Sequence, residues 1–87
     1  MSYSVKPLEV NLQAHHAVYC DKIPGVALID FSSARKAEGF KKFLEKESPP
    51  DGDVEALIKF LKTNETKVKD CQWAKACGHA RKVLEAL

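Results

Sequence analysis

The chain has 87 residues, of which 45% are hydrophobic and 30% are charged, and its formal net charge is +2. This length suits one domain, residues 1–87. A chain this small buries only about 60–65% of the surface that it exposes when unfolded, which leaves little room for an enclosed substrate pocket. The composition is globular rather than disordered, and no apolar run approaches the roughly 20 residues of a membrane span.

The cysteine count and the first residues indicate a compartment. Three cysteines form a poor disulfide framework, since one is left over from any pairing. The opening MSYSVKPLEV lacks a basic segment followed by a continuous apolar stretch, as a secretory signal would have. We therefore expect a reducing, cytoplasmic location and no membrane partner.

The N-terminal third is expected to form β-structure. Residues 8–15 alternate apolar and polar side chains at every position, which is the period of a half-buried strand. A helix starting at Pro7 is the competing interpretation, and it would make the domain an all-α protein of four helices. Residues 15–20 and 26–31 predict two more strands, with a turn at Pro24 and Gly25 between them.

From Ser32 onward the hydrophobic period becomes helical. Three helices are expected near residues 33–47, 53–63 and 65–86. Ser32 or Ser33 can cap the first, and Asp51 or Asp53 the second. Strands followed by helices predict an α+β fold with a short N-terminal sheet region and three helices.

Residues 71–80, CQWAKACGHA, hold the residues most suggestive of chemistry. On one helix, Cys77 and His79 would point about 200° apart, and Cys71 would lie about 12 Å of rise from His79, so the three cannot share a zinc ion. Trp73 and Cys77 instead fall on an apolar helical stripe, which predicts packing. We expect neither a metal nor any other cofactor.

Cys71 is expected on the opposite side of that helix, between Lys67 and Lys75. Neighbouring ammonium groups favour a thiolate, so Cys71 is a candidate reactive thiol, although a solvated surface cysteine is the simpler interpretation. No histidine stands three or four residues away to act as its base. We predict no catalytic residues and no enzymatic activity.

The favoured function is a small protein-binding or regulatory module, such as an adaptor subunit. The segment VALIDF is apolar on both faces of its predicted strand, and Phe60 stands between Lys59 and Lys62 at the edge of a helix stripe. Surplus apolar surface of this kind is commonly covered by a protein partner or by a second copy, which would give a homodimer. The predicted contact residues are Val26, Leu28, Ile29, Phe31 and Phe60.

The alternative function is nucleic-acid binding through a helix–turn–helix arrangement of the last two helices. Residues 54–87 carry seven basic side chains against four acidic ones. This excess falls short of a dedicated basic stripe, and acidic residues at the start of the last helix would lie close to phosphates. The candidate basic surface consists of Lys59, Lys62, Lys67, Lys69, Lys75, Arg81 and Lys82.

Overall fold

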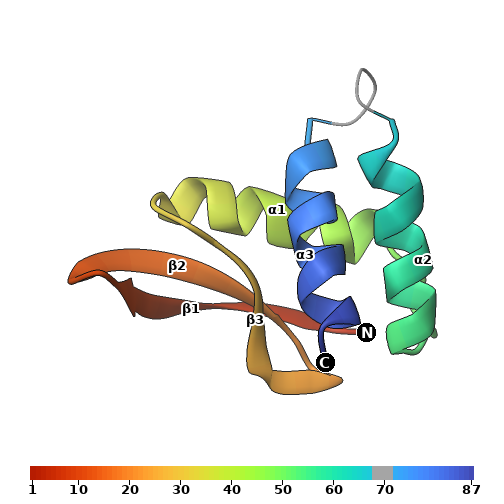
Figure 1. The fold of residues 1–87 in the computed structure, drawn as a ribbon, viewed down its shortest axis with the longest axis horizontal. Helices are drawn as coiled ribbons and strands as arrows, with labels where there is room; N and C mark the ends of the chain where they lie inside the picture. The colour runs from red at the N-terminus through yellow and green to blue at the C-terminus, as the bar shows by residue number, and fades with distance from the viewer. Residues whose placement is uncertain (68–71) are drawn as a thin grey trace.

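A computed structural model of the chain describes residues 1–67 and 72–87. A three-stranded antiparallel sheet precedes three helices, which confirms the α+β prediction and contradicts the all-α alternative (Figure 1). The strands lie side by side in chain order: β1 (Tyr3–Val10), β2 (Gln13–Cys20) and β3 (Ile23–Phe31). The helices are α1 (Ala34–Glu47), α2 (Val54–Glu65) and α3 (Ala74–Glu85).

The first hairpin corrects the expectation of one strand over residues 8–15. Val10 pairs with Gln13, and Asn11 and Leu12 form a two-residue turn with φ angles of 49° and 67°. Asparagine tolerates this left-handed region, whereas the second position usually holds glycine. The apolar–polar alternation of residues 8–15 continues through Asn11 and Leu12, so the sequence pattern did not indicate a turn there.

The second hairpin turns at Asp21 and Lys22, not at the predicted Pro24 and Gly25. Pro24 and Gly25 lie inside β3, where the pairing with β2 changes register. A second shift inserts Leu28 between the pairs Tyr19–Ala27 and Val18–Ile29. An extra residue of this kind disturbs the alternation of a strand, and here both Leu28 and Ile29 are buried.

The first two helices begin and end close to their predicted positions. The side chains of Ser33 and Asp53 accept hydrogen bonds from the N–H groups of Lys36 and Ala56, as helix N-caps do. The predicted helix over residues 65–86 is wrong at its start. Glu65 is the last residue of α2, and α3 begins only at Ala74.

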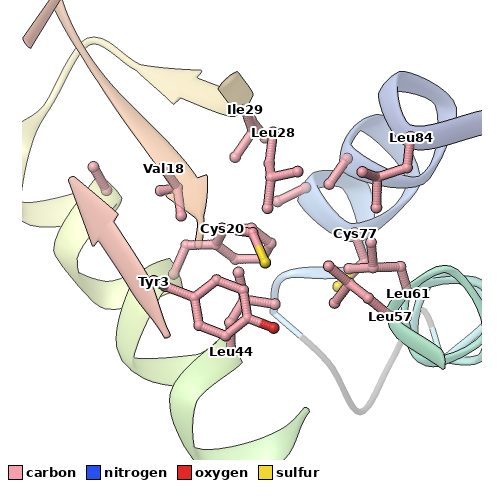
Figure 2. Close-up of a cluster of buried hydrophobic side chains, with 14 residues drawn as sticks. Tyr3, Val18, Cys20, Leu28, Ile29, Leu44, Leu57, Leu61, Cys77 and Leu84 are labelled. Atoms are coloured by element: carbon pink, nitrogen blue, oxygen red, sulfur yellow. The ribbon is translucent and has the colours of Figure 1, made fainter. Parts of the chain in front are cut away.

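The core lies between one face of the sheet and the helices. α1 and α3 pack against the sheet, and α2 packs alongside α3. Figure 2 shows strand side chains meeting leucines from the helices and the Cys77 side chain of α3. The fully buried members include Val18, Leu28, Phe40, Leu44, Leu57, Leu61 and Cys77.

Candidate binding site

The register shift in β3 decides which of the predicted contact residues remain accessible. Leu28 is 0% exposed and Ile29 is 9% exposed, and both belong to the core of this chain. Val26 and Phe31 are half-buried. The strand is therefore not a surface with apolar side chains on both faces, and within this fold Leu28 and Ile29 are not available to a partner.

Phe31 and Phe60, predicted as separate sites, lie at the two ends of one row of aromatic rings. The aromatic row consists of Phe31, Trp73, Phe40, Phe43 and Phe60. Ring centroids of successive neighbours are 5.6–6.2 Å apart, which is the range of favourable aromatic pairs. Phe40 is fully buried, whereas the other four rings are half-buried.

Gly39 makes room for the row on α1. A Cβ atom at this position would lie 3.2 Å from Cζ2 of Trp73, which is tighter than ordinary contact. The glycine, which weakens a helix, thus allows the indole to lie against the helix backbone. In the sequence, a glycine within the predicted helix is the signal that a side chain could pack closely against α1. Nothing in the pattern identified Trp73 as that side chain.

A pocket of about 380 Å³ opens at the first end of the row. Phe31 and Trp73 form its aromatic wall, with their ring planes at 70° and their centroids 6.2 Å apart. Lys36 of α1 and Lys75 of α3 stand among its lining residues. We call this the Phe31–Trp73 pocket; it is lined by Phe31, Lys36, Gln72, Trp73, Lys75 and Ala76.

A groove of about 410 Å³ opens at the other end, where α2 passes the end of α1. Phe60 lies in it together with Pro49 and Ala56. Lys59 and Lys67 are also in its lining, as is the carboxylate of Glu47. Both ends of the aromatic row therefore combine a half-buried ring with lysine side chains.

A third groove, of about 430 Å³, runs between the end of α2 and the outer face of α3. Lys75, His79 and Lys82 line it from α3, at a spacing of four and three residues that places them on one helix face. We call Lys75, His79 and Lys82 the α3 basic stripe. Lys75 also lines the Phe31–Trp73 pocket, so the pocket and the groove adjoin.

Glu65 is the one carboxylate among the described residues lining that groove, and it is paired with Arg81. Nε and Nη2 of Arg81 both donate to this carboxylate, the second over 3.0 Å, and Nη1 donates to Glu85. The hydrogen bonds from Arg81 lower the pKa of the Glu65 carboxyl. Arg81, predicted as part of a basic surface, is thus occupied by two carboxylates of this chain.

The remaining basic candidates do not form a recognition helix. Lys67 follows the end of α2 rather than lying on α3, and Lys62 is exposed on α2. Lys69 and Cys71 lie outside the described residues. Figure 1 shows α2 and α3 as antiparallel neighbours, whereas the two helices of a helix–turn–helix unit cross at a steep angle.

The opposite face of the sheet carries a polar pair that the sequence interpretation missed. Nδ1 of His15 lies 2.7 Å from Oδ2 of Asp30 on the neighbouring strand. The ammonium of Lys6 lies 5.5 Å from the centroid of the Tyr19 ring, within cation–π range. The adjacent histidines have different neighbours: His15 contacts Asp30, while His16 pairs with Phe31 in the sheet.

The structure separates the residues first considered for metal binding. Cys77 is fully buried, and His79 of the same helix is exposed. Across residues 1–67 and 72–87, no three His, Cys, Asp or Glu side chains are arranged to hold a metal ion. Cys71 lies outside the described residues, so the absence of a zinc site stays a prediction.

Among residues 1–67 and 72–87, every helix is too short or too polar to span a lipid bilayer. Comparisons with protein-family models, with curated proteins and with solved structures give no match to this chain.

Proposed function

We propose that this chain is a small non-enzymatic module that binds a protein partner through the two open ends of its aromatic row. The observation that carries the proposal is the half-buried state of Phe31, Trp73 and Phe60 beside concave surfaces. Aromatic side chains in such positions are the usual anchors of protein interfaces, because they bury much area at little cost in conformational entropy. A regulatory or adaptor role in the cytoplasm is part of the proposal.

Photo-crosslinking tests the proposal at the level of single residues. A photoreactive phenylalanine analogue, p-benzoylphenylalanine, would replace Phe31 or Phe60 in separate proteins. Tyr19, a half-buried aromatic residue that lies beside Lys6 and outside the aromatic row, is the matched control position. After irradiation of the cells and nuclease treatment of the lysate, we expect a protein adduct of defined mass from Phe31 or Phe60 and none from Tyr19.

Each result of this experiment has a definite meaning. An adduct of twice the chain's mass would identify a second copy as the partner, as predicted for a homodimer. Adducts confined to the Tyr19 position would show that the open face of the sheet is the binding surface. The absence of protein adducts at Phe31 and Phe60 would contradict the proposal.

Nucleic-acid binding is the second candidate, and the α3 basic stripe is the observation that favours it. The engagement of Arg81 by Glu65 and Glu85 and the antiparallel α2–α3 pair count against it. Electrophoretic mobility shift of a labelled single-stranded and a double-stranded oligonucleotide at low and high salt tests it. Binding to phosphates weakens steeply as salt rises.

A further inference from the structure

We propose that the partner contacts this chain with an acidic peptide segment. The segment would insert one apolar side chain into the Phe31–Trp73 pocket and lay its carboxylates along the α3 basic stripe. This inference rests on the proposed function and names the chemistry of the partner. It is drawn from the observation that Lys75 belongs to both the Phe31–Trp73 pocket and the α3 basic stripe.

The geometry suits an extended peptide. Lys75 and Lys82 are seven residues apart on α3, which corresponds to about 10 Å of helix rise. An extended chain covers that length in about three residues at roughly 3.3 Å each. A peptide whose apolar side chain occupies the pocket beside Lys75 can therefore place carboxylates near His79 and Lys82.

Among residues 1–67 and 72–87, the charge of this surface is not fully balanced. Lys36 and Lys75 line the pocket, and no carboxylate is among the described residues lining it. In the groove, the carboxylate of Glu65 is paired with Arg81 and also interacts with the charge of Lys82, so it offsets only part of the positive charge there. Complementary negative charge on a partner would speed its association and orient it.

Lys75 is also poorly placed for the stability of its own helix. It lies in the first turn of α3, where the helix dipole favours negative charge. That turn contains no acidic residue, and Trp73 at the N-cap provides no side-chain hydrogen bond. Helix stability therefore does not account for a lysine here, whereas a bound carboxylate does.

The ring geometry favours a peptide over a nucleic acid. Bases bind by stacking on an exposed ring face. Phe31 and Trp73 instead meet edge to face, and both pack against Phe40, so they form the walls of an apolar recess. The stripe itself consists of lysine and histidine, without the forked guanidinium that suits phosphate recognition.

Peptide selection on the intact chain tests the inference. A random dodecapeptide library would be displayed and selected on the wild-type protein. We expect selected peptides to be enriched in Asp and Glu around one large apolar residue. Trp73 is the only tryptophan, so binding of tryptophan-free versions can be followed by its fluorescence. We also expect binding to weaken, without vanishing, as salt rises, because apolar contact persists.

Matched variants locate the binding surface. The double variant Lys75→Glu/Lys82→Glu should bind the selected peptides at least tenfold more weakly. The control variant Lys22→Glu/Lys42→Glu carries the same charge change at two exposed lysines that line none of the three grooves, and it should bind as the wild type does. A circular dichroism spectrum of each variant establishes that it is folded.

Several outcomes would overturn the inference: no selected peptides, peptides without acidic enrichment, or equal binding by both double variants. Displacement of the peptides by a single-stranded oligonucleotide at lower concentration would assign the stripe to nucleic acid instead. These failures differ from failure of the proposed function. Crosslinking of a protein at Phe31 or Phe60 without acidic selection would leave the module a protein binder with a different partner chemistry.

Discussion

The aliphatic core and the aromatic row fill the same molecule in different ways. In the core, leucine and valine side chains from the sheet and the helices meet with no exposed surface, as at Val18, Leu28 and Leu57. In the aromatic row only Phe40 is fully buried, and the rings on either side of it reach the surface. The first region is closed by the chain itself, and the second is left open.

This difference indicates a division between stability and binding. Deleting a side chain from a closed region leaves a cavity, whereas deleting one from an open region removes less contact. Lysines surround the open region but are absent from the core cluster. We expect changes in the core to act on the free energy of unfolding, and changes around the row to act on binding.

The largest expected effect is in the core. Leu57→Ala should lower the free energy of unfolding by about 2–5 kcal/mol, because the leucine is fully buried between α2 and its neighbours. Urea denaturation followed by circular dichroism measures it. An unchanged midpoint of denaturation would mean that the Leu57 side chain of α2 is not part of a closed core.

At the open end of the row the same kind of truncation should cost less. Phe60→Ala is expected to lower the free energy of unfolding by about 1–2 kcal/mol, since a half-buried ring gives up only part of the transfer energy of a buried one. The same denaturation series compares it with Leu57→Ala. A loss equal to or above that of Leu57→Ala would remove the distinction between the two regions.

The fold was predictable where local signals agreed. Ser33 and Asp53 are both capping residues and lie directly before apolar-periodic segments, so two helices were placed to within two residues. The start of α3 was missed because residues 65–73 contain no proline or glycine. The turn at Leu12 was missed because leucine is not the residue expected at positive φ.

The candidate site was predictable only in its parts. Phe31, Phe60, Lys75 and Lys82 were each singled out, but the row that joins the two rings depends on tertiary contacts with Phe40 and Phe43. Burial of both Leu28 and Ile29 follows a register shift, which no period-2 pattern reveals. His79 was considered as a metal ligand, and its place beside two lysines emerges only from the helix that carries them.

A smaller expected effect is a pH dependence of the free energy of unfolding that arises in the core and not in the aromatic row. Burial raises the pKa of the Tyr3 hydroxyl and of the Cys20 thiol, both in the core cluster. The folded state therefore holds these protons more tightly than the unfolded state does. The stabilisation is complete below the unfolded pKa values, about 8.5 for cysteine and 10 for tyrosine, and is lost as pH rises through the folded values.

Alkaline denaturation of two variants checks this expectation. Cys20→Ala should remove the first part of the stability loss above about pH 8.5, and Tyr3→Phe the part above about pH 10. Tyr3→Phe also removes the 2.9 Å hydrogen bond between the Tyr3 hydroxyl and Ser48, which lowers stability at every pH. Identical slopes with pH in wild type and both variants would contradict the assignment.

The smallest expected effect distinguishes binding from stability most sharply, because one substitution should raise the free energy of unfolding while it weakens binding. Lys75 lies in the first turn of α3, and Lys82 lies in its last turn. The dipole of a helix favours negative charge at its start and positive charge at its end, by about 0.3–1 kcal/mol per charge. Lys75→Glu should therefore raise the free energy of unfolding by about that amount, and Lys82→Glu should lower it.

Both single variants should nevertheless weaken the binding of acidic peptides, because each removes one cation of the α3 basic stripe and adds an anion. Urea denaturation at low ionic strength gives the stability difference, and Trp73 fluorescence gives the affinity. A loss of stability in Lys75→Glu would show that the lysine serves its own helix. A gain of stability together with a loss of affinity would show that Lys75 favours partner binding at a cost to the stability of α3.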